Sequence, residues 1–272
     1  MFDFGTIDLL SLGLYCFATT ASGLLIYHSV ALYYHWRYYV RRADAPGGWK
    51  CQPKRALKPR LARQARLYGS LNMTLAGVIT GVLVYAIADH GLWTMLYFDV
   101  SQYGWVYLAV SGPLVWLVTD LMAYYIHRMF HIKWLFRRFH RIHHRYVATT
   151  PWTATAMHPV EMLSLQLTAL ATIFFIPLHP AVISSVLVYN LVFNIIDHSG
   201  VKLESSLPWQ GSSRYHDDHH AHFHCNFGQH MTLWDRLHGT LRRQKRVYGV
   251  DVFGGRGIVD GAEQGPPPFV DY

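Results

Sequence analysis

Apolar residues are concentrated in five long runs that polar segments separate from one another. The runs cover about residues 7–36, 71–88, 105–126, 160–176 and 181–196. Because a helix of about 20 apolar residues spans the hydrocarbon core of a bilayer, we expect each run to form a transmembrane helix. The first run lacks the basic region and small-residue cleavage site of a signal peptide, so we expect it to stay in the protein. Pro177 and Pro180 separate the last two runs and predict a tight helical hairpin.

The composition supports this interpretation and limits the class of protein. Of the 272 residues, 51% are hydrophobic and only 15% are charged, whereas roughly a quarter are charged in soluble globular proteins. The net charge of +8 fits the positive-inside rule for membrane proteins, and we expect no nucleic-acid partner. The three cysteines form no CxxC motif, which argues against a disulfide framework and against a thiolate metal site.

The charged residues also predict how the helices are oriented. Residues 37–70 and 127–159 are rich in lysine and arginine, whereas the segment between the second and third runs contains neither. The positive-inside rule therefore places residues 37–70, 127–159 and 197–272 in the cytosol. We expect an all-α integral membrane protein of four to five transmembrane helices with a cytosolic helical cap. Its predicted parts are three helices in 1–126 with the basic loop 37–70, a cytosolic segment 127–159, a transmembrane hairpin 160–197, a cytosolic segment 198–253 and a flexible tail 254–272.

Histidines are concentrated in the predicted cytosolic segments and recur at helical spacing. Fifteen of the eighteen lie between residues 127 and 238. HRMFH and NIIDH each place two polar groups at i and i+4, and the frame H-x-x-H-H occurs twice, in HRIHH and in HDDHH. Residues at these spacings share one face of a helix, so the three imidazoles of each frame can converge. The candidate ligands are His127, His131, His140, His143, His144, His198, His216, His219 and His220.

The number and chemistry of these groups predict two metal ions rather than one. A single ion with four or five ligands cannot use all of these histidines, whereas two ions can. Ligation by nitrogen alone suits zinc, iron, copper or nickel and argues against magnesium and calcium. Ligating histidines usually donate their second nitrogen to a carboxylate or a carbonyl. Asp120 lies inside the third run, where a charge is costly, and we expect it to bond to His127.

Other polar residues beside the motifs are candidates to support the ligands, either through hydrogen bonds or as water-mediated ligands. His222 and His224 alternate with His220, which favours an extended segment, and we expect them to support ligands or to lie at the surface. The supporting candidates besides Asp120 are Asn194, His158, Asp197, Asp217, Asp218, His222 and His224.

Taken together, the motifs resemble those of one superfamily. The order HX3H, HX2HH and, after a hydrophobic hairpin, a second HX2HH is similar to that of the integral-membrane fatty acid hydroxylases and sterol desaturases. The resemblance covers about residues 103–240 and includes DLMAYYIHRMFH, RFHRIHHRYVATTPWTATAMHPVE, YHDDHHAHF and CNFGQHMTLWDRLHGT. WKCQPK, AMHPVE and NFGQHMTLWDRLHGT look most similar to sterol C-5 desaturases. His222 and His224 depart from that pattern, and Asn194 stands where some hydroxylases have a histidine.

The resemblance implies a function, cofactors and partners. It implies an O2-dependent oxidoreductase that desaturates or hydroxylates a lipid C–H bond at two non-haem iron ions, which zinc can replace on purification. Sterol C-5 desaturation is the implied reaction, and hydroxylation of a fatty acyl chain or another lipid is the alternative. The implied partners are a sterol or acyl lipid from the bilayer and an electron donor, either cytochrome b5 or a ferredoxin, with its reductase. We expect no catalytic side chain beyond the metal ligands. The implied location is the endoplasmic reticulum of a eukaryote or the cytoplasmic membrane of a bacterium.

Two functions of other classes remain open at this point. A zinc-dependent membrane hydrolase would use about three of the histidines and a bound water, which leaves most of the candidate ligands unexplained. A metal transporter would place its ligands near the middle of the bilayer, whereas these histidines lie at the ends of the apolar runs. Both functions explain the histidine pattern less completely than the oxidoreductase does.

Overall fold

A computed structural model describes residues 6–205 and 210–242 of the chain. Within these two ranges the regular elements are helices, accompanied by three isolated β-bridges. Four of the helices are long and apolar enough to cross a membrane. The expectation of an all-α membrane protein with four to five such helices is therefore confirmed. The predicted tail 254–272, and residues 243–253 before it, lie outside the described residues.

The four long helices follow four of the five apolar runs. They are α1 (Leu9–Tyr34), which continues as the π-helix η1 (His35–Val40), α3 (Pro59–Ala88), α4 (Gly104–Phe130) and α8 (Pro180–Asp197). α3 and α8 each begin with a proline at the first helical position, where the missing N–H would have no partner within the helix in any case.

The fourth apolar run does not form a helix of spanning length. It forms α7 (Pro159–Leu170) and the short 3-10 helix η5 (Ala171–Phe174). The chain then turns away from the helix, because the carbonyl of Ile173 accepts a hydrogen bond of 2.8 Å from the N–H of Met95 and Pro177 follows. The expected pair of transmembrane helices is thus corrected to a short apolar helix followed by the single long helix α8.

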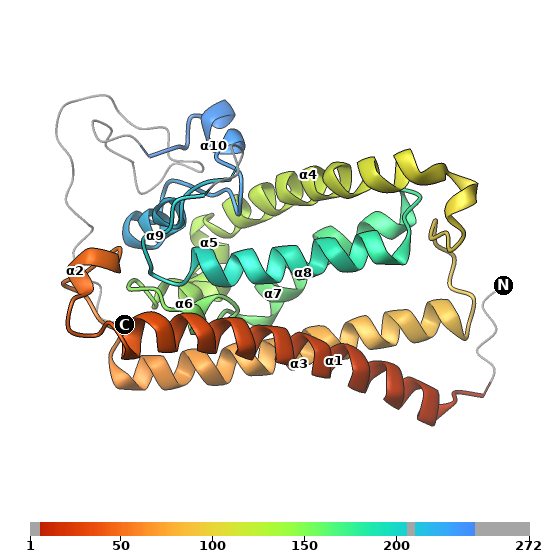
Figure 1. Cartoon of the computed structure of the whole chain (residues 1–272), viewed down its shortest axis with the longest axis horizontal. Helices are drawn as coiled ribbons and strands as arrows, with labels where there is room; N and C mark the ends of the chain where they lie inside the picture. Colours follow the sequence, from red (N-terminus) through yellow and green to blue (C-terminus); the bar gives the residue numbers. More distant parts are fainter. Residues whose placement is uncertain (1–5, 206–209, 243–272) are drawn as a thin grey trace.

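α1 and α3 lie side by side along the bundle (Figure 1). Their backbones approach closely at Gly77 and Gly81 of α3. A Cβ on Gly77 would lie 2.5 Å from the Cα of Thr20, and a Cβ on Gly81 would lie 2.4 Å from the Cα of Cys16. Small residues at such contacts allow membrane helices to pack tightly. Thr19 adds a hydrogen bond of 2.7 Å to the carbonyl oxygen of Gly77.

Most of the short helices gather at one end of the bundle, opposite to the connection between α3 and α4 (Figure 1). At this end lie α2 (Pro46–Trp49), α5 (Lys133–Leu135), α6 (Arg141–His144), α9 (Ser213–His222) and α10 (Leu233–His238). The remaining short elements are η2 (Val100–Gln102), the π-helix η3 (Phe136–His140) and η4 (Pro151–Thr153). Because α4 and α8 both end here, the two histidine-rich segments that follow them come together.

Candidate metal centre

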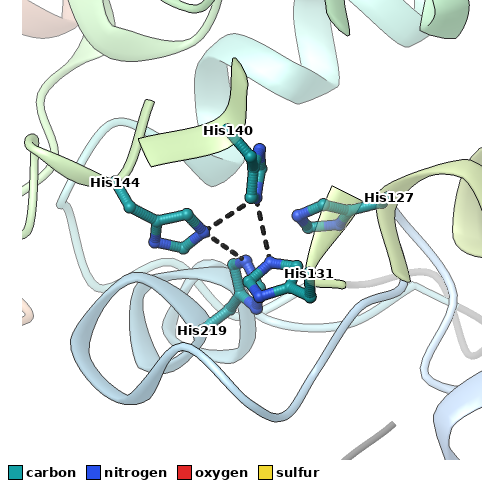
Figure 2. A group of neighbouring side chains, drawn as sticks. All are labelled: His127, His131, His140, His144 and His219. Carbon is teal, nitrogen blue, oxygen red and sulfur yellow. Dashed lines mark hydrogen bonds between the residues drawn. The ribbon is translucent and has the colours of Figure 1, made fainter. Parts of the chain in front are cut away.

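The nine predicted ligands lie together at this end of the bundle, in two groups. Group A comprises His127, His131, His140, His144 and His219, and group B comprises His143, His198, His216 and His220. Within each group the candidate ligand atoms lie within 4.8 Å of one another, and all nine side chains are buried. Figure 2 shows the five rings of group A turned toward one another. Two metal positions, rather than one, would produce such a grouping.

Each H-x-x-H-H frame is divided between the two groups. In the first frame the outer pair, His140 and His144, belongs to group A, whereas His143 belongs to group B. The second frame is arranged in the opposite sense, because its outer pair belongs to group B and its middle histidine, His219, belongs to group A. Successive residues of a helix point about 100° apart, so the adjacent histidines face different sides. The expectation that the three imidazoles of one frame converge is therefore wrong, and each frame instead contributes to both groups.

Main-chain carbonyls of the loop after α9 orient two rings of group A. His127 Nδ1 donates to the carbonyl oxygen of Phe227 at 2.8 Å, and His219 Nδ1 donates to that of Cys225 at 2.7 Å. A carbonyl oxygen only accepts, so the proton of each neutral ring lies on Nδ1 and the lone pair lies on Nε2. Both rings therefore present Nε2 as the atom that can bind a metal.

A buried aspartate holds this loop in place. The carboxylate of Asp235 accepts hydrogen bonds from the N–H groups of Phe227 at 2.9 Å and Gly228 at 2.7 Å. It also accepts from the hydroxyl of Thr240 at 2.5 Å and from the hydroxyl of Tyr215. Asp235 thus fixes the segment whose carbonyls orient two candidate ligands. No role for Asp235 was predicted from the sequence, although it lies in the stretch CNFGQHMTLWDRLHGT that carries part of the resemblance.

A carboxylate that sequence reasoning missed supports a third ring of group A. His140 Nδ1 lies 2.7 Å from Oε1 of Glu161, and both side chains are buried. Glu161 lies in the first turn of α7, where acidic side chains are favoured. A signal for it existed, because Glu161 is the one acidic residue between Asp120 and Asp197 in the sequence.

Group B gives the clearest indication that these rings suit a cation. His198 Nδ1 donates to the carbonyl oxygen of Asn194 at 2.8 Å, and His143 Nδ1 donates to that of Ala156 at 3.4 Å. Both Nε2 atoms then carry lone pairs, yet they lie 3.1 Å apart. Two lone pairs repel each other at this distance, and a cation between them would turn the repulsion into ligation. The donor set therefore fits a metal ion that accepts nitrogen ligands.

Burial keeps the imidazoles neutral. Desolvation lowers the pKa of His140 to about 3 and the pKa of His143 to about 4. Desolvation, with neighbouring imidazoles adding to it, also lowers the pKa of His131 and of His216 well below the ordinary value. The neutral ring is the form of histidine that binds metal, so these side chains need no deprotonation at physiological pH.

The four aspartates expected to support the ligands lie elsewhere. Within the described part of the chain, none of them forms a hydrogen bond with a ring of group A or group B. Asp120 accepts from the N–H of His230 at 3.1 Å and from Nε1 of Trp234 at 2.7 Å, so the expected bond to His127 is wrong. Asp197 forms a buried ion pair with His230, with an oxygen 3.1 Å from Nδ1.

The two aspartates of α9 have partners outside the histidine groups. Asp217 accepts hydrogen bonds from Thr149 at 3.0 Å and from Gln52 at 3.1 Å. Asp218 forms a partly exposed ion pair with Arg242 at 3.1 Å. These contacts join α9 to neighbouring segments of the chain.

The remaining supporting candidates also have contacts of their own. The side chain of Asn194 donates to a main-chain carbonyl at 3.2 Å, and His158 caps the N-terminus of α7. His222 is the last residue of α9, so the expected extended conformation is wrong at that position. His224 follows the helix and is half-buried, as His222 is.

Four helices able to span a membrane and two buried groups of histidines define this chain as a membrane protein with a candidate dinuclear metal centre. Residues 112–240, which contain every histidine of groups A and B, match the family model described as fatty acid hydroxylase. This match confirms the resemblance inferred from the motifs over that part of the chain.

Several curated proteins are similar to the chain. Lathosterol oxidase of Mus musculus is 34% identical over 161 residues, which are 58% of this chain and 54% of that protein. A Delta(7)-sterol 5(6)-desaturase of Schizosaccharomyces pombe is 31% identical over 168 residues, 62% of this chain and 56% of that protein. Cholesterol 25-hydroxylase of Homo sapiens is 32% identical over 133 residues, 46% of this chain and 49% of that protein. The chain thus spans about half the length of these relatives. No solved structure gives a significant match.

Proposed function

We propose that the chain is a membrane-bound, O2-dependent oxidoreductase that desaturates or hydroxylates a C–H bond of a lipid. Sterol C-5 desaturation is the favoured reaction, because sterol desaturases are among its relatives. The observation that carries the proposal is the pair of buried imidazole groups inside the part of the chain that matches the fatty acid hydroxylase family model. Hydroxylation of a sterol, a fatty acyl chain or another lipid is the alternative, and the similarity to cholesterol 25-hydroxylase supports it.

We further propose that group A and group B each hold one iron ion. When bound, the two ions would supply the activation of O2 and the oxidation of an unactivated C–H bond. The chain itself supplies ligands that are neutral, so the positive charge of the metal is not cancelled as it would be by carboxylates. Glu161 and the carbonyls of Cys225 and Phe227 hold three of the group A rings in orientation.

The position of the two groups supports a substrate that comes from the bilayer. His127 lies in the last turn of α4, and His131 and His198 lie at the C-termini of α4 and α8. A lipid between the helices would therefore bring its reacting carbon to the membrane interface. The positive-inside rule supports a cytosolic cap, in the endoplasmic reticulum or in a bacterial cytoplasmic membrane.

An external electron donor belongs to the same proposal. The sequence contains no GxGxxG motif that opens a helix after a strand, so we assign the chain no nicotinamide or flavin of its own. Residues 37–70 are rich in lysine and arginine and contain a single acidic residue, Asp44. Such a surface suits an acidic carrier, either cytochrome b5 or a ferredoxin with its reductase.

The test is metal and product analysis of the full chain purified without oxygen. We expect about two irons per chain, O2 consumption when a donor and a sterol are supplied, and a sterol product with a new double bond or hydroxyl group by mass spectrometry. Sterol and fatty acyl substrates are offered side by side so that the substrate class is decided in one experiment. Protein reloaded with zinc is the control and should form no product.

Other results would reject the proposal. Tightly bound zinc with turnover in the absence of O2 would indicate a hydrolase. Metal uptake into liposomes that contain the protein, without lipid oxidation, would indicate a transporter.

A further inference from the structure

A surface pocket lies beside the metal centre, in the segment that follows α4. Its lining residues are Ile132, Lys133, Trp134, Arg137 and Arg138, and all five are exposed. Within this helical stretch, Lys133 and Arg137 are four residues apart, and so are Trp134 and Arg138. Side chains four apart lie on one face of a helix. The pocket therefore combines three cations with one aromatic and one aliphatic side chain.

The cations of this pocket form no ion pair with an acidic side chain of the described residues. The sequence contains no aspartate or glutamate between Asp120 and Glu161. Among the described residues, none of the ion pairs involves Lys133, Arg137 or Arg138. Three positive charges around one pocket attract an anion, and several such contacts act together on a group with more than one oxygen, such as a phosphate.

An exposed apolar stripe of α4 leads into the pocket. Met122, Tyr125, Met129 and Ile132 are spaced by three, four and three residues and are 38%, 48%, 38% and 41% exposed. Trp134, which is 65% exposed, continues the stripe into the pocket. The spacing places Met122, Tyr125 and Met129 on one face of α4, and Ile132, which follows the helix, lines the pocket. On a helix that spans a membrane, such a face contacts the acyl chains of the surrounding lipid.

We propose that the stripe and the pocket together bind one anionic phospholipid. Its acyl chains lie along the α4 stripe, and its phosphate lies between Lys133, Arg137 and Arg138. Trp134 lies at the level of the headgroup, where tryptophan is enriched in membrane proteins. The positive-inside prediction places this pocket on the cytosolic leaflet, which is the leaflet that carries anionic lipid.

The continuity of the stripe with the pocket favours a lipid over an acidic protein. A soluble carrier could contact the cations, but it could not cover an apolar face that runs back along a spanning helix. The inner side of the same segment carries the buried rings of His131 and His140. A phospholipid bound outside would therefore hold the backbone of two group A histidines at the interface. The binding itself does not depend on the proposed oxidase function.

The test uses the full chain in detergent, titrated with phosphatidylglycerol and with phosphatidylcholine that carries the same brominated acyl chains. The readouts are the number of lipids retained in native mass spectrometry and the quenching of tryptophan fluorescence. We expect wild type to bind phosphatidylglycerol about tenfold more tightly than phosphatidylcholine. The triple variant Lys133→Gln, Arg137→Gln, Arg138→Gln should lose this preference, and the single variant Arg137→Gln should weaken it.

A second triple variant removes the same charge elsewhere. Lys58, Arg60 and Arg63 are exposed at the start of α3, and their replacement by glutamine should leave the preference unchanged. Equal thermal unfolding of the two triple variants shows that the pocket variant is folded. If it is not, the single Arg137→Gln variant decides the result in the same assay.

Three outcomes would overturn the proposal. In the first, wild type binds the two lipids equally, as expected if the pocket serves an acidic protein. In the second, the pocket variants keep the full preference, or the α3 variant loses as much of it. In the third, millimolar inorganic phosphate displaces the lipid completely, which would show that the apolar stripe contributes nothing.

Discussion

The Nε2 atoms of His143 and His198 lie 3.1 Å apart, although 55 residues separate the two histidines. His143 belongs to the short helix α6, whereas His198 is the C-cap of the spanning helix α8. Group B therefore exists only because the bundle brings the C-terminus of α8 against α6. Each of these rings is held by a main-chain carbonyl, which leaves its Nε2 directed at the other ring.

This relationship predicts the effect of His143→Ala. The variant removes one ligand of group B and leaves group A complete, so we expect bound iron to fall from about two to about one per chain. Turnover should fall at least about a hundredfold, because the ligands act as a unit and removal of one costs about as much activity as removal of several. Metal analysis and product formation are measured together. His179→Asn is the control, because His179 caps the other end of α8 and asparagine can also cap a helix. Full activity of His143→Ala would show that the ligand assignment is wrong.

Glu161→Ala is predicted to weaken metal binding without removing a ligand. The variant leaves Nδ1 of His140 without its 2.7 Å partner, and loss of such a partner typically lowers metal affinity by about 10- to 100-fold. Glu161→Gln should lose less metal affinity, because the amide oxygen of glutamine can still accept the hydrogen bond from His140. Competition with a chelator measures the affinity. Glu204→Ala removes an exposed carboxylate and should change nothing. Equal affinity of the alanine variant and wild type would contradict the proposed role.

Asp235→Ala is predicted to destabilise the loop that orients two group A rings. It leaves the buried N–H group of Phe227 without an acceptor, at a cost of about 1–3 kcal/mol, and leaves the N–H group of Gly228 with only the hydroxyl of Tyr215 as acceptor. We expect a lower unfolding temperature and loss of iron from group A before group B. Thermal unfolding and metal analysis measure the two effects. Asp218→Asn, in a partly exposed pair, should stay within about 0.5 kcal/mol of wild type. If iron content is retained while stability falls, Asp235 is structural only.

Gly77→Ala is predicted to disturb the contact between α1 and α3. The new Cβ would lie 2.5 Å from the Cα of Thr20, so one backbone must move, at a cost of about 1–3 kcal/mol. Gly13→Ala is the matched control, because nothing lies within 4 Å of the Cβ it adds. We expect the first variant to unfold at a lower temperature and the second to be unchanged or slightly more stable. Equal stability of Gly77→Ala and wild type would show that the helices separate freely.

Local sequence patterns were sufficient to predict the four long helices and the histidines of the candidate centre. Apolar runs of spanning length fixed α1, α3, α4 and α8, since length and composition are local properties. The nine histidines were also identifiable from the sequence, because spacings of three and four report a shared helical face. The motifs carried the family resemblance for the same reason.

Tertiary packing decided what each residue contacts. It divided both histidine frames between two groups. It also made Glu161 and four main-chain carbonyls, rather than the four aspartates, the hydrogen-bond partners of the rings. It also ended the fourth apolar run early, through a hydrogen bond from Met95 to Ile173. The periodicity of the sequence predicts which side of a helix a residue occupies. Which segment approaches that side depends on contacts between residues distant in the sequence, and no local pattern records them.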